Sequence, residues 1–220
     1  MQTMYTEEQE QFREVVARFL RVKSTAGDVR QLMASSEGYD VAVWRQLCGE
    51  VGLAGTHIPE EYGGLGLGYL ELCVIAEELG RSLAPTPFSS SVYLATESIL
   101  QFGSDSLKQA NLPSLASGEK IGAFAHTEST TSPTEENITC EFKDGSLNGS
   151  KIAVTDGDVA DFFIVSAKSG SGVGLFLVES SADGVEVASQ PTLDPSRSHA
   201  AITFKNAKAE ALDSGWSNIT

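Results

Sequence analysis

The spacing of the hydrophobic residues changes near Gly118, and this change limits the chain to a few fold classes. Before Gly118, apolar residues such as Phe12, Val15, Val16 and Phe19 recur at the spacing of one helical face. After Gly118 they gather in short runs rich in β-formers, separated by turn residues. Helices followed by strands, without alternation, favour an α+β organisation. We therefore expect an amino-terminal all-α domain followed by a small antiparallel β-barrel or sandwich domain.

The first half of the chain carries helix start and stop signals. Thr6 and Gln9 have the spacing of a capping box at the start of a helix. A second helix is expected after Asp40, with Gly52 as its stop. Further helices are expected over residues 69–79, 88–102 and 106–116.

The second half predicts about seven short strands, over residues 121–126, 138–142, 152–155, 162–167, 175–178, 185–188 and 200–204. Turn signals separate them: Asp144-Gly145, Asn148-Gly149, Asp156-Gly157, the glycine-serine stretch 169–172 and Asp183-Gly184. The expected domain limits are residues 1–118 for the helical domain and 119–214 for the β-domain. Residues 215–220 are expected to begin a further helical domain.

Charge and composition exclude several classes of protein. The 220 residues include 30 acidic and 15 basic side chains, a net charge of −15, which repels phosphate backbones and argues against nucleic acid as a partner. The amino terminus lacks a basic, then apolar, signal pattern, and no apolar stretch is long enough to span a bilayer. Cys48, Cys73 and Cys140 form no metal-ligand pattern, so no metal site is predicted. Cys48 and Cys73 are expected to be core thiols, and a reducing, cytoplasmic location is the default expectation.

Four stretches, in order along nearly the whole chain, resemble acyl-CoA dehydrogenases. They are Pro59-Glu60-Glu61-Tyr62-Gly63-Gly64-Leu65-Gly66; Ala76-Glu77-Glu78-Leu79-Gly80; Ala123-Phe124-Ala125-His126-Thr127-Glu128; and Leu147-Asn148-Gly149-Ser150-Lys151 followed by Val154-Thr155. Each is a weak signal alone, but four at the family's spacings form a specific one.

The resemblance implies a site for flavin adenine dinucleotide (FAD) on the β-domain. It identifies Phe124, Ala125, His126, Thr127, Ala153, Val154 and Thr155 as cofactor-binding residues. The Thr127 hydroxyl is expected to bind the pyrimidine edge of the flavin, where it would stabilise the anion formed on reduction. The alternative is that Thr127 and Thr155 only cap strand ends. Ser132 is the candidate substrate-binding residue.

Two departures from the family pattern affect this expected site. The usual glycine-containing loop after Thr127-Glu128 is replaced by residues 129–136, and Pro133 stands at the position of the family's serine, so Ser132 is only a substitute. Ala153 stands where the family has a tryptophan that packs on the flavin. Loss of an indole weakens apolar contact with a planar ring. FAD binding by these 220 residues is therefore expected to be weak or absent.

The resemblance also implies the reaction and the partners. The family removes hydrogen from the α and β carbons of an acyl-CoA thioester and passes electrons to an electron-transfer flavoprotein, acting as a homo- or hetero-oligomer. We expect no catalytic base among the 220 residues, because the matching glutamate lies in the carboxy-terminal helical domain. The leading interpretation is a partial enzyme of lipid catabolism that is inactive alone. The alternatives are a non-catalytic subunit of a hetero-oligomeric acyl-CoA dehydrogenase and a stand-alone acyl-CoA-binding module.

Overall fold

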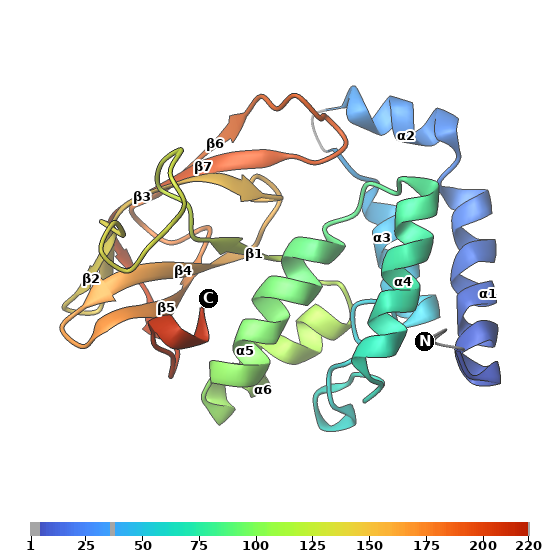
Figure 1. The fold of residues 1–220 in the computed structure, drawn as a ribbon, viewed down its shortest axis with the longest axis horizontal. Coiled ribbons are helices and arrows are strands. Elements are labelled where there is room, and N and C mark those ends of the chain that lie inside the picture. Colours follow the sequence, from blue (N-terminus) through green and yellow to red (C-terminus); the bar gives the residue numbers. More distant parts are fainter. Residues whose placement is uncertain (1–4, 36–37, 220) are drawn as a thin grey trace. The chain divides into compact units, whose positions relative to one another are not determined.

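A computed structural model describes residues 5–35 and 38–219 of the chain (Figure 1). The chain divides into two compact units. Unit 1 comprises Met1–Thr86 and Leu112–Glu119, and unit 2 comprises Pro87–Asn111 and Lys120–Thr220. The domain limits expected from the sequence, 1–118, 119–214 and 215–220, remain a prediction. No helix in the described part of the chain is long and apolar enough to cross a membrane.

Unit 1 is helical, and the start of its first helix and both ends of the helix expected after Asp40 lie where the sequence chemistry predicts, whereas the helix expected over 69–79 continues to Ser82. Its elements are α1 (Glu7–Lys23), α2 (Ala26–Met33), α3 (Val41–Val51), the 3-10 turn η1 (Glu60–Tyr62) and α4 (Tyr69–Ser82). The capping box of α1 is present: the Thr6 side chain accepts from the Gln9 amide, and the Gln9 side chain accepts from the Thr6 amide. Asp40 caps α3, and Gly52 ends it in the left-handed conformation at φ 74°. Helix α2 was not predicted from the sequence.

The core of unit 1 forms where α1 packs beside α4 and α3, as Figure 1 shows. Val16, Leu20 and Trp44 are buried there, and the Trp44 indole N–H donates to the Gly118 carbonyl at 3.1 Å. Arg13 on α1 pairs with Glu78 on α4 at 3.0 Å. Cys48 is buried as expected, but Cys73 is exposed on α4, so the prediction of a core thiol was wrong there.

The segment predicted as one helix over 88–102 is a π-helix, η2 (Ser89–Thr96), followed by α5 (Glu97–Phe102). A π-helix widens the turn by one residue, which repositions the side chains on its faces. Here η2 packs closely on the first strand of unit 2: the Gly122 amide donates to the Ser91 hydroxyl at 3.2 Å. A Cβ at position 122 would lie 2.5 Å from the Cβ of Ala95, so the glycine permits this contact. Helix α6 (Asp105–Ala116) follows.

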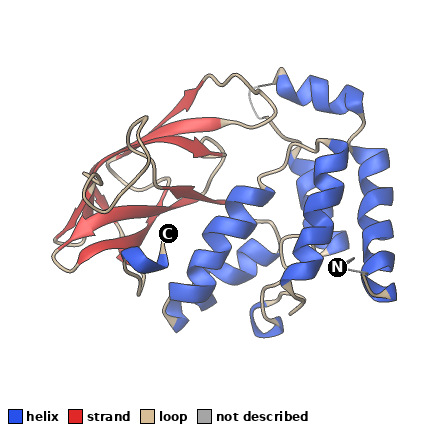
Figure 2. Cartoon of the chain, viewed as in Figure 1, coloured by secondary structure: helices blue, strands red, loops and turns tan. Residues whose placement is uncertain are grey.

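Unit 2 is built on an eight-stranded sheet, drawn in red in Figure 2. The strands are β1 (Gly122–Ala125), β2 (Glu141–Lys143), β3 (Ser146–Thr155), β4 (Phe162–Ser169), β5 (Gly172–Glu179), β6 (Val185–Gln190), β7 (His199–Lys208) and β8 (Glu210–Ala211). Their order is β6-β7-β3-β2-β4-β5-β8, with β1 paired to β4 off this path. The α+β prediction is confirmed. The sheet is mostly antiparallel, although β1 and β2 both pair with β4 in parallel.

One predicted turn proved to be strand. Asp144-Gly145 forms the hairpin turn between β2 and β3, but Asn148-Gly149 lies inside β3. A register shift between Leu147 and Asn148 accommodates the pair, and the Asn148 side chain accepts from the Asn206 amide at 2.9 Å. Gly149 has φ 140°, and a Cβ there would lie 2.8 Å from the Cα of Cys140. The extra residue at the register shift is Asn206 on β7, and Gly149 serves a close approach of the Cys140 backbone to β3, and not a turn.

Candidate functional site

Strand β1 presents two different faces. Ala123 and Ala125 are fully buried in the core of unit 2, whereas Phe124 and His126 are half-buried on the other side of the strand. After Ala125 the strand ends, and His126 and Thr127 continue as irregular chain. The side chains of Phe124 and His126 are thus free of the core and lie where a ligand could reach them.

The structure brings residues 124–127 beside residues 152–155. The Ile152 amide donates to the Thr127 carbonyl at 2.8 Å. Immediately after Ile152, Ala153 adopts φ 51° in a second irregularity of β3, where the pairing with β7 shifts between Lys151 and Val154. The Ala153 amide donates to the Gln190 side chain at 2.8 Å, which stabilises this bulge. Bulges of this kind re-aim side chains next to functional sites.

The two candidate threonines differ in their hydrogen bonds. The Thr155 hydroxyl lies 3.3 Å from Nε2 of His199, its cross-strand partner on β7. The Thr127 hydroxyl has no hydrogen bond within residues 5–35 and 38–219, and the residue is half-buried. Thr127 therefore keeps a donor and an acceptor available for a ligand, whereas Thr155 is already engaged by the fold. Val154 is different again, because its side chain belongs to the core.

Lys151 is fully buried directly behind this region. Its ammonium group donates to Glu128 Oε1 at 2.7 Å, to the Ser166 hydroxyl at 3.0 Å and to the His126 carbonyl at 3.2 Å. These three bonds use all three ammonium protons. They join the end of β1 to β3 and β4, and so fix the backbone on both sides of Thr127.

Glu128 completes the charge balance of this cluster. Besides Lys151, the carboxylate accepts from the Thr139 hydroxyl and amide and from the Cys140 amide. Burial acts to raise the pKa of Glu128, but the bonds from Lys151, Thr139 and Cys140 outweigh it and hold that pKa below its usual value. The pKa of Lys151 is lowered by burial, against the opposing effect of Glu128. Ionised in its pair, Glu128 is an acceptor and structural anchor, and not a free base.

His126 lies among aromatic rings and next to Lys151. The ring centroids of Phe124 and Trp216 lie 6.0 and 5.8 Å from its own. Trp216 belongs to the 3-10 turn η3 (Trp216–Asn218). Burial and the Lys151 charge lower the pKa of His126, so the imidazole is neutral near pH 7. The result is a half-buried group of three rings at the end of β1, in the segment that continues into Thr127.

Ser132 stands apart from this group in its contacts. It is exposed in the loop 129–137, and its carbonyl accepts from the Asn137 side chain at 2.9 Å. Within the described chain its hydroxyl makes no hydrogen bond to the other candidate residues. The structure thus assembles the cofactor candidates but does not add Ser132 to them.

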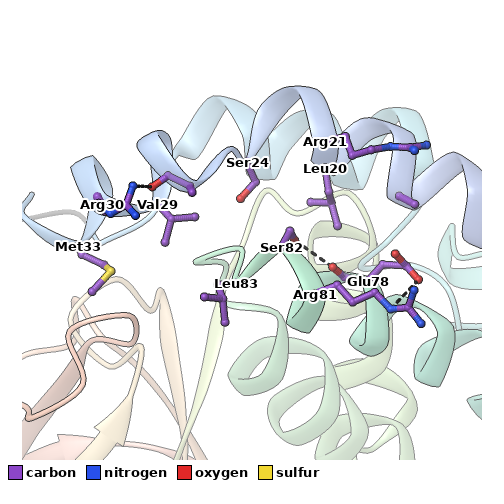
Figure 3. Close-up of a pocket in the computed structure, with 12 residues that line it drawn as sticks. Leu20, Arg21, Ser24, Val29, Arg30, Met33, Glu78, Arg81, Ser82 and Leu83 are labelled. Carbon is purple, nitrogen blue, oxygen red and sulfur yellow. Dashed lines mark hydrogen bonds and ion pairs between the residues drawn. The ribbon is translucent and has the colours of Figure 1, made fainter.

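A separate cavity of about 730 Å³ lies in unit 1, between the carboxy-terminal parts of α1 and α4 and helix α2 (Figure 3). Leu20, Val29 and Met33 give it apolar walls, and Arg21 and Arg81 are among its lining residues. Figure 3 shows Arg81 tied to Glu78. None of the expected cofactor-binding residues lines this cavity.

Comparison with known proteins decides the family. The family model "Acyl-CoA dehydrogenase, N-terminal domain" matches residues 6–119. The chain belongs to the acyl-CoA dehydrogenase family. The mitochondrial isovaleryl-CoA dehydrogenase of Arabidopsis thaliana is 33% identical over 196 residues, covering 84% of this chain and 48% of that protein.

Two solved structures are similar to nearly the whole chain. The ChsE4-ChsE5 complex from Mycobacterium tuberculosis aligns with a TM-score of 0.85 at 29% identity, covering 99% of this chain and 59% of that one. The acyl-CoA dehydrogenase of Bacillus anthracis complexed with FAD aligns with a TM-score of 0.83 at 26% identity, covering 96% and 38%. The chain spans about half the length of the curated relatives that it matches.

Sequence reasoning missed the residues behind the site. Lys151 and Glu128 were noted only as parts of family motifs, and Ser166, His199 and Trp216 were not proposed as neighbours of the site. One signal was available: Leu147, Gly149 and Lys151 alternate along one face of β3, so Lys151 stands at an inward-facing position. A lysine there requires an anionic partner, but the sequence does not say which.

Proposed function

We propose that this chain provides the amino-terminal helical domain and the middle β-domain of a flavin-dependent acyl-CoA dehydrogenase. The observation that carries the proposal is the meeting of the β1 end with the β3 bulge, at a segment that carries both the half-buried rings of Phe124 and His126 and the unpartnered hydroxyl of Thr127. This combination fits a planar ring with acceptor atoms on one edge. FAD, when bound, supplies the acceptor for the hydride that leaves the β carbon of the acyl group.

The residues of this chain would bind and orient the flavin. They would not abstract the proton from the α carbon of the acyl-CoA. Thr127 would donate its hydroxyl hydrogen bond to the flavin edge, and Phe124 and His126 would contact the ring. Ala125 and residues 153–155 would shape the site through their backbone, at the end of β1 and at the bulged end of β3. The Lys151–Glu128 pair would hold Thr127 in position. We assign no catalytic base among the described residues. Glu128, which follows Thr127, is held in its ion pair with Lys151, and Asp156, which follows Thr155, is buried and accepts a hydrogen bond from Ser90.

The remaining parts of the proposal are carried by family membership alone. They are an acyl-CoA thioester as substrate, an electron-transfer flavoprotein as electron acceptor, and an oligomeric assembly. Ser132 stays a candidate for contact with the acyl-CoA, and the cytoplasmic location stays a prediction.

An FAD titration tests the proposal. We expect the purified 220-residue chain to be colourless, without the flavin absorbance band at about 450 nm, because Ala153 offers no indole to the ring. Added FAD should nevertheless bind saturably and weakly, and the flavin should not bleach when acyl-CoA is added without oxygen. Thr127→Ala should weaken binding, whereas Thr130→Ala, in the exposed loop, should not. Absence of saturable binding up to about 1 mM FAD would contradict the proposal.

A second candidate function is a non-catalytic subunit of a hetero-oligomeric acyl-CoA dehydrogenase. Ala153 favours it, because an exposed methyl group stands where the family places a flavin-packing tryptophan. Co-expression with a related full-length chain distinguishes this function from the first proposal. A non-catalytic subunit should form a stable complex in which all flavin is bound by the partner.

A further inference from the structure

Ser166 lies between two polar groups at the centre of the buried cluster. Its hydroxyl oxygen is 2.8 Å from Nδ1 of His126 and 3.0 Å from Nζ of Lys151, and the residue is 0% exposed. Buried polar groups of this kind satisfy their hydrogen bonds with one another, so the partners in this cluster decide where each proton lies.

The positions of the protons follow from what each group can do. A lysine ammonium only donates, and Lys151 is kept charged by Glu128 at 2.7 Å. Ser166 must therefore accept from Lys151. Its own proton then needs an acceptor, and Nδ1 of His126 is the only other partner of Ser166 in the described chain. Nδ1 accordingly accepts, and the proton of the neutral imidazole lies on Nε2.

The opposite tautomer, with the proton on Nδ1, is inconsistent with these hydrogen bonds. With a proton on Nδ1, Ser166 would face two donors, and its own hydroxyl proton would have no acceptor inside a buried cluster. Protonation of both nitrogens meets the same obstacle and adds a charge beside the Lys151 ammonium. The fold therefore selects one tautomer.

We propose that His126 is a positioning residue whose Nε2–H is a fixed hydrogen-bond donor to an acceptor atom of a planar heteroaromatic cofactor. The inference rests on the proposed flavin site and assigns a side-chain role within it. The imidazole follows directly after β1, with the rings of Phe124 and Trp216 at 6.0 and 5.8 Å, and its Nε2 has no hydrogen-bond partner among residues 5–35 and 38–219. A carbonyl oxygen or unprotonated ring nitrogen fits such a donor, whereas an N–H edge does not.

The tautomer is tested without any ligand. Long-range nitrogen–proton NMR of the 220-residue chain labelled at histidine nitrogen distinguishes a protonated from an unprotonated Nδ1. We expect Nε2–H alone in the unmodified protein, and a mixture of tautomers in Ser166→Ala, which removes the proton that Nδ1 accepts. A protonated Nδ1, or a mixture in the unmodified protein, overturns the inference.

The donor role is tested by FAD titration of two variants, followed by flavin fluorescence. His126→Leu keeps the volume but removes the N–H, and should raise the dissociation constant about tenfold. His126→Gln offers an amide N–H at a similar reach and should stay within about threefold of the unmodified protein. Circular dichroism melting confirms that both variants are folded. Equal affinity in His126→Leu and the unmodified protein overturns the donor role.

The two tests separate this inference from the proposed function. If FAD binds saturably but Nδ1 carries the proton, only the inference about His126 fails. If Nε2 carries the proton but no FAD binds, the proposed function fails and takes the cofactor role of His126 with it.

Discussion

At the scale of single residues, Lys151 organises the candidate site. Its side chain is 0% exposed and its partner Glu128 is 10% exposed. A buried pair of this kind contributes little net stability compared with an apolar pair, but loss of one member leaves an uncompensated charge. Removing either residue alone should therefore cost much more than removing both charges together.

Lys151→Met should reduce the free energy of unfolding by about 3 kcal/mol, because Glu128 remains buried without its cation. The double variant Lys151→Met with Glu128→Gln should lose less than the single variant. Urea denaturation followed by circular dichroism measures both. The matched control is Lys205→Met, which breaks the exposed pair with Glu186 (63% and 65% exposed) and should cost no more than about 1 kcal/mol. Equal losses in Lys151→Met and Lys205→Met would show that the buried pair is unimportant.

His126 predicts a pH dependence of stability. Its pKa in the folded protein lies below the ordinary value of 6.5, because of burial and the Lys151 charge. Below pH 6.5 the unfolded chain therefore binds a proton that the folded chain refuses, and the free energy of unfolding falls as the pH falls towards the folded pKa. His126→Gln should lack this component. Thermal melts of both proteins between about pH 7.5 and 5 measure it, and parallel curves would refute the assignment.

At the scale of elements, the sequence predicts best what is local. The start of α1 and both ends of α3 were predicted correctly, since capping boxes, Asp caps and terminal glycines act within a few residues. The π-helix Ser89–Thr96 was missed, because its wide turn depends on packing against β1 and not on its own residues. For the same reason Glu128 could not be assigned to Lys151, which lies 23 positions away in the sequence. The resemblance to the family did single out residues 124–127 and 153–155, two segments that the fold places side by side.

Gly149 in β3 gives a prediction that separates close approach from backbone strain. Gly149→Ala should cost about 2–3 kcal/mol, because the new Cβ would meet the Cys140 backbone and φ is unfavourable. Gly145→Ala is the matched control: its φ is 78°, but nothing lies within 4 Å of the new Cβ. It should cost only about 1 kcal/mol. Denaturation midpoints of the two variants compare these values, and an equal loss would mean that the space between Gly149 and Cys140 can hold a side chain.

The end of α4 gives a prediction of the opposite sign. Leu83 caps this helix in the left-handed conformation at φ 51°, although its side chain is 68% exposed. Glycine is the usual residue there. Leu83→Gly should relieve strain with little loss of apolar burial and raise the free energy of unfolding by about 0.5 kcal/mol. Leu83→Ala is the control, since it shortens the side chain but keeps the strain, and should not stabilise. A destabilised Leu83→Gly would show that the side chain contributes packing.

At the scale of the whole molecule, the loop 129–137 should be the first site of proteolysis. Glu135 and Glu136 are exposed in it, and Asn137 holds it closed through bonds with Ser132 and Thr134. A glutamate-specific protease should cut there first. Asn137→Ala should accelerate the cut about fivefold by favouring local opening, whereas Thr130→Ala should not. Mass spectrometry of early fragments locates the cut, and initial cleavage inside a helix of unit 1 would contradict the expectation.

The partition of the chain between the two compact units has a consequence for modularity. The polypeptide passes from one unit to the other at residues 86/87, 111/112 and 119/120, and the second of these passages falls inside α6. Neither unit is therefore a continuous stretch of sequence. A recombination event, an exon boundary or a cloning junction placed at any single one of these points would separate residues that belong to the same unit. Transfer of either unit as an intact body therefore requires junctions at more than one of these points.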